Sequence, residues 1–587
     1  MKNVIVIIDG KEVEALTGTT ILEAAKSAGI KIPSLCYMNI PEIGFKNDCA
    51  SCRICVVEVV GRKNLVPACA TPVSPGMIIN TNTMEVLEKR RNVLELMLSN
   101  HPTDCLICAK NGKCDLQTLA MEFGIRDIRF KGKIFEYRRE VSPSIVRDLD
   151  KCIMCRRCEN MCNNIQRCQV LSAVNRGFKS VVSTAFESDL DKTNCTFCGQ
   201  CVAVCPVGAL YEKDYTWGLI KDIANPRKRV TVQVAPAVRV AIGEEFGYEP
   251  GTDVTGKLVT ALKKLGFDDV FDTNYAADLT IMEEAAEFKQ RLEKYLSGDK
   301  NVKLPILTSC CPAWVNFIEH HYPDMLDIPS SAKSPQQMFG AVLKNIWGPA
   351  RGIKRDEIIN VSIMPCLAKK YESSRSEFFT DGVPDVDYSI STRELAHLLK
   401  QSNIDLKKME DSEFDNPLGY STGAAVIFGR TGGVIEAATR TLYEWMTNQT
   451  LEEVDFKSMR GMEGIKISEV KVGDTVVKIG IANGLSAARD ILDKVRTGEE
   501  FFHAIEIMAC KGGCVGGGGQ PYHHGNFEKV VKRAEGLQCI DNEKMFRKSH
   551  ENPYIQSLYE KYLEHPLSSE AHRILHTKYY SKKNKIT

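Results

Sequence analysis

The chain has 587 residues, which is too long for a single hydrophobic core, so several domains are expected. Its net charge of +1 gives no electrostatic case for binding nucleic acid or an anionic membrane, and 43% hydrophobic residues is ordinary for a globular protein. Residues 1–15 predict a strand, an Asp-Gly turn and a second strand, and not a signal peptide. We find no apolar run long enough to span a bilayer, so we expect a cytoplasmic protein.

Cysteine is the informative residue type in this chain. There are 23 cysteines, and most stand in close groups with two-residue gaps, which is the spacing of metal ligands. A disulfide framework suits short secreted domains in oxidising compartments. The pattern therefore favours metal clusters over disulfides.

The first cysteine group follows the hairpin and a helix-like stretch at residues 20–30. Four thiolates with one tight pair suit a 2Fe-2S cluster, and the predicted ligands are Cys36, Cys52, Cys55 and Cys69. The layout resembles a β-grasp ferredoxin, and "CRICVVEV" resembles the N-terminal domain shared by complex I and hydrogenase subunits. A long gap after Cys36 brings in Cys49 as a rival ligand.

The second group, "HPTDCLICAKNGKC", combines one histidine with three cysteines: His101, Cys105, Cys108 and Cys114. It resembles the one-histidine, three-cysteine 4Fe-4S site of the same families. An imidazole in place of a thiolate makes the site less negative, which raises its potential.

The third group is a two-cluster ferredoxin run written twice, "CIMCRRCENMC" and "CTFCGQCVAVCP". In that fold the fourth cysteine of each run ligates the other cluster. One predicted 4Fe-4S set is therefore Cys152, Cys155, Cys158 and Cys205, and the other is Cys195, Cys198, Cys201 and Cys162. Zinc is disfavoured because its sites use separated pairs. Cys49, Cys168 and Cys539 are left without an assigned role.

The sequence changes character after about residue 222. Residues 229–243 predict a strand entering a turn, residues 253–267 an amphipathic helix, and residues 269–296 a strand, a loop and a long helix. This alternation predicts an α/β domain with parallel strands, large enough for two lobes around a cleft.

Three cysteine motifs are scattered over this last segment: "TSCCPAW", "MPCLAKKYE" and "EIMACKGGCVGGGGQP". One thiol from the first motif, with Cys366, Cys510 and Cys514, would supply the ligands of a cubane cluster. Neighbouring side chains in an extended segment point to opposite sides, so Cys310 and Cys311 should have different tasks. The many glycines of the third motif would let the backbone approach a bulky cofactor.

These three motifs resemble the signatures of the iron-only (FeFe) hydrogenases, and the upstream cluster motifs resemble those of the multi-cluster members. The resemblance covers essentially the whole chain and implies a multidomain α/β and α+β protein. The expected parts are a 2Fe-2S ferredoxin domain at 1–80, a small one-histidine, three-cysteine cluster domain at 81–130, a two-cluster ferredoxin domain at 131–222, and a hydrogenase domain with a C-terminal small-subunit-like tail at 223–587.

The resemblance also implies a six-iron active site, in which a 4Fe-4S cube is joined to a diiron unit carrying carbon monoxide, cyanide and a dithiolate. Its implied ligands are Cys311, Cys366, Cys510 and Cys514. Lys369 would face a cyanide, and Met364 and Met508 would shield the diiron unit, although core packing is the commoner role of methionine. The implied proton path uses Cys310, Glu284, Glu287 and Ser330.

The implied function is reversible oxidation of hydrogen, with electrons relayed through one 2Fe-2S and three accessory 4Fe-4S clusters. Ferredoxin is the expected partner, because no GxGxxG follows a predicted strand and a nicotinamide would need a flavin-bearing partner subunit. Two alternatives remain at this point: a hydrogen sensor or assembly scaffold, and an electron-transfer subunit of a larger NAD(P)-linked complex. The sequence leaves open the catalytic bias, oxygen tolerance and oligomeric state.

Overall fold

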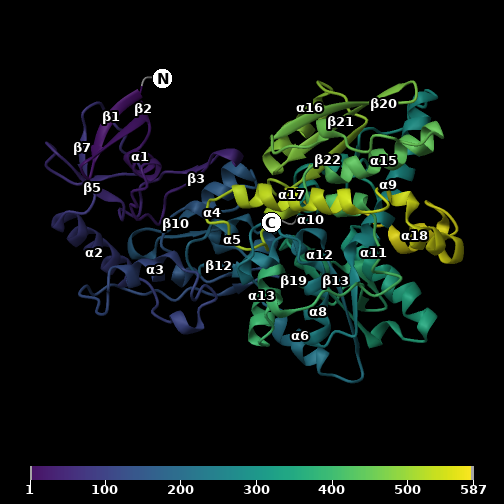
Figure 1. Cartoon of the computed structure of the whole chain (residues 1–587), viewed down its shortest axis with the longest axis horizontal. Coiled ribbons are helices and arrows are strands. Elements are labelled where there is room, and N and C mark those ends of the chain that lie inside the picture. The colour runs from purple at the N-terminus through teal and green to yellow at the C-terminus, as the bar shows by residue number, and fades with distance from the viewer. Residues whose placement is uncertain (1–2, 584–587) are drawn as a thin grey trace. The chain divides into compact units, whose positions relative to one another are not determined.

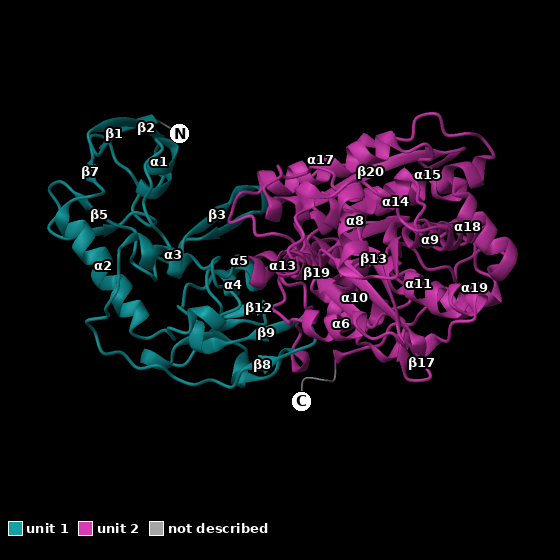
Figure 2. Cartoon of the chain, turned by 60° about the horizontal axis from the view of Figure 1, so that its bottom comes forward, with its two compact units in different colours: residues 1–164, 169–190, 204–211 teal, residues 165–168, 191–203, 212–587 magenta. Residues whose placement is uncertain are grey.

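The computed structural model describes residues 3–583, which divide into two compact units (Figure 2). Unit 1 comprises residues 1–164, 169–190 and 204–211, and unit 2 comprises residues 165–168, 191–203 and 212–587.

Unit 1 begins with a five-stranded sheet in the order β2-β1-β7-β5-β6. The strands are β1 (Asn3–Ile8), β2 (Lys11–Leu16), β5 (Val56–Val59), β6 (Val66–Pro67) and β7 (Ile78–Asn80). The predicted hairpin is present, since β1 and β2 pair antiparallel around Asp9 and Gly10. Helix α1 (Ile21–Ser27) contributes Ile21, Ala24 and Ala25 to the core that this sheet encloses.

The rest of unit 1 is built from short elements, because cluster-binding loops take up most of the chain. Helix α2 (Met84–Leu98) leads to the His101 segment, and α3 (Asp115–Glu122) follows Cys114. Strands β8 (Glu140–Val141), β9 (Ile145–Arg147) and β12 (Leu210–Glu212) form a small sheet in the order β12-β9-β8.

Unit 2 contains two four-stranded sheets (Figure 1). The first is entirely parallel, in the order β14-β13-β16-β19, from β13 (Arg229–Val234), β14 (Asp269–Asp272), β16 (Ile358–Met364) and β19 (Tyr388–Ser391). The second, β15-β22-β21-β20, uses β15 (Ile306–Leu307), β20 (Ile465–Val472), β21 (Thr475–Asn483) and β22 (Ala504–Met508), with only β20 antiparallel.

Long helices cover these sheets. The main ones are α8 (Thr255–Leu265), α9 (Thr273–Leu296), α13 (Thr392–Gln401), α15 (Gly433–Thr447), α16 (Leu485–Thr497) and α17 (Glu528–Glu543). The mixed α/β character predicted after residue 222 is confirmed. The loop expected after the strand near residue 270 is wrong: α9 begins directly after β14, because the Asp272 side chain caps the helix through the N–H of Asn274.

Among the described residues, no helix is long and apolar enough to cross a membrane.

Candidate functional site

Five cysteines from the three scattered motifs line one cavity of about 80 Å³ in unit 2: Cys310, Cys311, Cys366, Cys510 and Cys514. They meet because each motif directly follows a strand, β15, β16 or β22, and the loops after parallel strands gather at the carboxyl edge of a sheet. Ala235, Pro236 and Ala237 after β13 complete this wall.

Most of the cavity wall is apolar, and Met364, Met508 and Phe428 line it. Lys369 is the charged group of the wall, and its Nζ donates to the carbonyl of Cys310 (3.1 Å) and to Glu372 (3.0 Å). Burial lowers the pKa of Lys369, but the Glu372 carboxylate raises it above its ordinary value. The cavity therefore offers a fixed positive charge to an anionic ligand.

Cys310 and Cys311 share the cavity but have different neighbours. Cys311 is the extended residue that precedes helix α10 (Pro312–His321). Burial raises the pKa of both thiols, and nearby Glu284 adds to the rise at Cys310, whereas Lys369 acts to lower the pKa of Cys311. A metal thiolate is thus better accommodated at Cys311 and a protonated thiol at Cys310.

Helix α9 carries Glu284, whose side chain is buried behind Cys310. Its Oε1 accepts hydrogen bonds from the N–H (3.2 Å) and Oγ (3.1 Å) of Ser309, and its Oε2 is buried without a hydrogen-bond partner among the described residues. Burial raises the pKa of Glu284 to about 7. A carboxyl with that pKa can both accept and release a proton near neutral pH.

One turn later on α9, Glu287 accepts a hydrogen bond from Ser330 Oγ (2.8 Å) and pairs with Arg291 (2.5 Å). Glu287 is also buried, although two acidic residues at this spacing usually lie on a solvated face. The structure thus brings together every residue of the expected proton path, in two adjoining groups: Cys310 with Glu284, and Ser330 with Glu287.

The glycine-rich loop after Cys510 lies against neighbouring backbone. A Cβ atom at Gly517 would stand 2.2 Å from the Pro365 carbonyl oxygen, and one at Gly513, where φ is +87°, would stand 2.6 Å from the Thr431 nitrogen. Asn483 Oδ1 accepts from the Gly512 N–H (2.9 Å) and holds the loop. Glycine is required here because the backbone segments approach one another closely.

The residues Cys195, Cys198 and Cys201 belong to unit 2 and adjoin this same loop. Asn316 Nδ2 donates to the Cys195 carbonyl (2.9 Å), and Gln200 Nε2 donates to the Gly516 carbonyl (3.0 Å). Cys162, the fourth expected ligand of that set, is in unit 1.

The other ferredoxin set is assembled as expected within unit 1. Cys152, Cys155, Cys158 and Cys205 line one cavity, so the last cysteine of the second run joins the first three of the first run.

The thiols of Cys36, Cys52, Cys55 and Cys69 are buried together and hydrogen-bond to one another. Cys49 also contacts Cys36, but it is exposed, and its thiol lies 3.4 Å from the carbonyl of Cys155. The burial favours the predicted four as cluster ligands.

The ring of His101 is oriented like a metal ligand. Its Nδ1 lies 2.8 Å from the Pro102 carbonyl, whereas the buried Nε2 has no partner among the described residues. Because a neutral ring that donates from Nδ1 keeps a lone pair on Nε2, this atom is available to a metal. Burial lowers the pKa of His101, which favours the neutral ring.

Two leftover cysteines lie outside these sites. Cys168 is buried against Gln166 and Thr196, and Cys539 is exposed.

Sequence reasoning missed Glu506, a fully buried carboxylate of β22 that accepts from the N–H groups of Gly432 (2.5 Å) and Ile435 (2.9 Å). Burial raises the pKa of Glu506 to about 7. A single acidic residue inside the apolar strand "AIEIM" was the signal that could have identified it.

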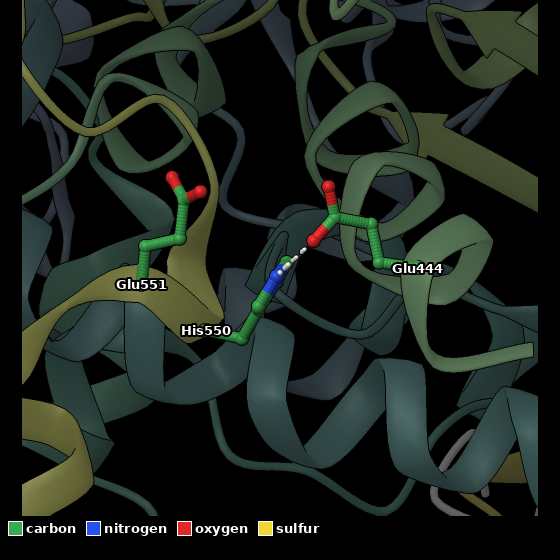
Figure 3. A group of neighbouring side chains, drawn as sticks. All are labelled: Glu444, His550 and Glu551. Atoms are coloured by element: carbon green, nitrogen blue, oxygen red, sulfur yellow. Dashed lines mark hydrogen bonds and ion pairs between the residues drawn. The ribbon is translucent and has the colours of Figure 1, made fainter. Parts of the chain in front are cut away.

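A separate group of potential metal ligands, Glu444, His550 and Glu551, is shown in Figure 3. His550 points at Glu444 (2.8 Å), while Lys548 Nζ lies 2.6 Å from Glu444 and 3.0 Å from Glu551. Since Lys548 pairs with both carboxylates and His550 hydrogen-bonds to Glu444, this group is a salt-bridge network.

Comparison with known proteins shows which family the chain belongs to. The model of the iron-only hydrogenase large subunit, C-terminal domain, matches residues 228–518, and that of the iron hydrogenase small subunit matches residues 527–582. The chain is 59% identical to NADP-reducing hydrogenase subunit HndD of Solidesulfovibrio fructosivorans, over 99% of this chain and 100% of the relative. The chain belongs to the iron-only hydrogenase family.

Two further matches agree with this membership. Iron hydrogenase 1 of Clostridium pasteurianum is 41% identical over 98% of this chain and 99% of its own. The solved apo [FeFe]-hydrogenase HydA1 from Chlamydomonas reinhardtii is 38% identical with a TM-score of 0.57, and it covers 63% of this chain and 99% of its own. This chain is therefore longer than HydA1.

Family models also match that N-terminal part: a 2Fe-2S cluster binding domain at residues 1–84, the NADH-ubiquinone oxidoreductase-G iron–sulfur binding region at 90–129, and the ferredoxin-like domain of NADH-quinone oxidoreductase subunit 3 at 142–211. The chain is therefore an enzyme with accessory 2Fe-2S and 4Fe-4S domains.

Proposed function

We propose that this chain catalyses the reversible oxidation of hydrogen to protons and electrons, at a six-iron site held by Cys311, Cys366, Cys510 and Cys514. The observation that carries the proposal is the meeting of these four thiols with Cys310 at one apolar cavity. When bound, the iron site supplies an open metal position for heterolytic cleavage of hydrogen.

The residues around the cavity transfer protons and bind an anionic ligand. Cys310 exchanges the proton, and Glu284 receives it through the carboxylate oxygen that has no other partner among the described residues. Ser330 and Glu287, which are hydrogen-bonded to each other, continue the route along α9, and the Arg291 guanidinium holds the Glu287 carboxylate in place. Lys369 holds an anionic ligand, while Met364 and Met508 keep water away from the site.

For the accessory clusters we propose one 2Fe-2S and three 4Fe-4S centres, in domains at residues 1–80, 81–130 and 131–222 that precede a two-lobed hydrogenase domain at 223–587. Contacts within unit 1 support a branched relay. Asn47 Nδ2 donates to the carbonyls of Cys36 (2.7 Å) and Cys155 (3.0 Å), and the N–H of Asp115, which follows Cys114, donates to the Pro206 carbonyl (2.9 Å). Both N-terminal centres thus adjoin the cluster of Cys155 and Cys205.

Two electron carriers fit the relay: ferredoxin, and a flavin-bearing partner subunit that reduces NAD(P). The second is favoured by the likeness to HndD, whose name makes it a subunit of an NADP-reducing hydrogenase, and by the NADH-oxidoreductase domains at residues 90–211. We place the protein in the cytoplasm.

Infrared spectroscopy of the matured protein tests the proposal most directly. Bands from metal-bound carbon monoxide and cyanide should be present, and anaerobic metal analysis should give about 20 irons per chain when each ligand set is filled. An iron content near 14 without these bands would instead identify an electron-transfer subunit.

A further inference from the structure

Two large apolar side chains are exposed to solvent in the segment that carries the predicted His101 cluster ligands. Leu106 and Ile107 lie between the ligands Cys105 and Cys108 in a short helical turn, and they are 91% and 84% exposed. Large apolar side chains at that exposure are costly to keep in water, and here two of them are adjacent. They therefore present an apolar surface directly beside two predicted ligands of a redox centre.

A basic segment runs beside the same centre. Residues 126–139 form no helix or strand, and they include six basic residues (Arg126, Arg129, Lys131, Lys133, Arg138 and Arg139) against two acidic ones (Asp127 and Glu136). All six basic residues are exposed.

This segment is anchored next to His101. The N–H of Lys133 donates to Asn100 Oδ1 (3.2 Å), and Arg129 pairs with Glu95 (2.7 Å) at the end of α2. A Cβ atom at Gly132 would stand 2.1 Å from the Ser99 carbonyl oxygen, so the backbone is in direct contact there. The basic segment therefore contacts the residues just before His101, the predicted histidine ligand. Cys105, the first predicted cysteine ligand of this set, follows His101 by four residues.

From this juxtaposition we propose that Leu106, Ile107 and the basic segment 126–139 form the docking surface for the acidic face of a separate electron-carrier protein. The proposal rests on the proposed function, because it requires a redox centre at His101, Cys105, Cys108 and Cys114. The apolar pair brings the partner's cofactor close to the cluster, and the basic segment orients an acidic partner before contact.

The test uses the full-length matured protein and an acidic two-cluster ferredoxin as the probe. Affinity for oxidised ferredoxin is measured by calorimetry at low and moderate salt. The ratio of ferredoxin-linked to methyl-viologen-linked hydrogen uptake is measured in parallel. Since oxidised ferredoxin binds without turnover, the affinity reports on docking even in a protein whose hydrogen chemistry has failed.

In the double variant Leu106→Gln/Ile107→Gln we expect Kd and the KM for ferredoxin to rise about tenfold, and the uptake ratio to fall correspondingly. In Arg126→Glu/Lys131→Glu, which leaves the cluster loop intact, we expect weaker binding that depends less on salt. Met545→Gln is the matched control, because Met545 is 86% exposed and lies in unit 2.

Iron content and the electron paramagnetic resonance signals of the reduced protein establish that each variant keeps its clusters. Unchanged ferredoxin affinity in both double variants would overturn the docking surface. So would a change in self-association, measured by analytical ultracentrifugation, without a change in ferredoxin affinity, because the apolar pair would then be covered by a second copy of the chain.

Discussion

At the residue scale, the two adjacent cysteines are distinguished by their neighbours. Cys310 has Glu284 nearby and Cys311 has Lys369, although both thiols line the same cavity. We expect Cys310→Ser to keep the infrared bands of the six-iron site and to lose most hydrogen evolution and uptake, because a hydroxyl is a far weaker acid than a thiol. Cys311→Ser should instead lose the cubane and, with it, those bands.

The control for this pair is Cys539→Ser, an exposed thiol outside the cavity, which should behave like the parent. A matured Cys310→Ser protein with parental turnover would show that this thiol only packs against its neighbours.

Glu284 supports a second prediction. Glu284→Gln keeps the shape of the side chain and an acceptor for Ser309, so the fold should survive, but hydrogen turnover should fall by about 100-fold or more because an amide does not carry protons. Glu293→Gln, on the exposed end of the same helix, is the matched control.

Glu284→Gln should also change how the stability of the fold depends on pH. Burial raises the pKa of Glu284 from 4.5 to about 7, so the folded protein holds this proton more tightly than the unfolded chain. That stabilisation is complete below about pH 4.5 and is lost as the pH rises through 7. Between pH 5 and pH 8 the thermal midpoint of the parent should therefore fall more than that of Glu284→Gln.

At the scale of elements, the site is built by strand ends. Strands β13, β15, β16 and β22 all deliver their following residues to one cavity, and the glycine loop closes against the Pro365–Cys366 segment. The convergence of the motifs was predicted from their ligand count and from the family resemblance, but the strands that produce it were not, because long-range strand pairing is encoded by no local pattern. The same limit applies to Glu287, whose burial follows from tertiary packing of α9.

Gly517→Ala tests the closure of this loop. The added methyl group would lie 2.2 Å from a backbone oxygen, which cannot move as a flexible side chain can, so we expect the loop to shift and the six-iron site to form poorly. Gly464→Ala, where the nearest atom is the Lys511 Nζ at 3.9 Å, should mature normally. Equal iron contents and infrared band intensities in the two variants would contradict this account.

Helix α17 is held to α15 by a buried charge network. Asp541 binds Arg440 (3.0 Å) and Arg547 (2.6 Å), and both the Arg440 and Asp541 side chains are fully buried. We expect Asp541→Asn to lower the free energy of unfolding by about 3 kcal/mol, because it removes one of the two buried carboxylates that balance Arg440 and leaves that guanidinium with Glu436 (2.8 Å) as its one buried carboxylate partner. The thermal midpoint should fall by several degrees, whereas Glu570→Gln, which breaks an exposed pair with Arg573, should change little.

The stabilisation from Asp541 depends on pH in the opposite direction to that from Glu284. Burial acts to raise the pKa of Asp541, but Arg547 and Arg440 lower it to about 2, below the ordinary 3.8. This stabilisation is present above about pH 4 and is lost as the pH falls toward 2. The difference in thermal midpoint between the parent and Asp541→Asn should therefore shrink below pH 4, and a difference that stays constant would exclude this network as its source.

At the scale of the whole molecule, one predicted ligand set is gathered at a single cavity, whereas the predicted domain bounds stay predictions. Cysteine spacing alone grouped Cys152, Cys155 and Cys158 with the distant Cys205, because the two-cluster ferredoxin run encodes that exchange locally. The predicted boundary near residue 222 does not coincide with the division into compact units, because residues 191–203 group with unit 2 through Gln200 and Asn316.

Because residues 191–203 contact the rest of unit 2, removing the N-terminal part of the chain should affect the catalytic domain as well. A chain beginning near residue 222 keeps both sheets of unit 2 and most of their cores, although it loses the fully buried Leu219 of α6 (Thr216–Ile223). Solved hydrogenases match only 63% of this chain at 99% of their own length. We therefore expect it to fold and to turn over hydrogen with methyl viologen. Because it lacks the Gln200 contact to Gly516 and the Cys195 contact to Asn316, fewer chains should acquire the iron site.

Turnover should accordingly be expressed per active site, and the intensity of the infrared bands gives the number of six-iron sites in each preparation. On that basis viologen-linked uptake should approach that of the parent, whereas ferredoxin-linked uptake should fall by more than about tenfold, because electron transfer to a partner requires the accessory centres at the partner's surface. Full-length protein mixed with a separately added N-terminal fragment serves as the control for nonspecific inhibition. Undiminished ferredoxin-linked turnover per site in the shortened chain would show that electrons leave the catalytic unit directly, and the accessory clusters would then need another role.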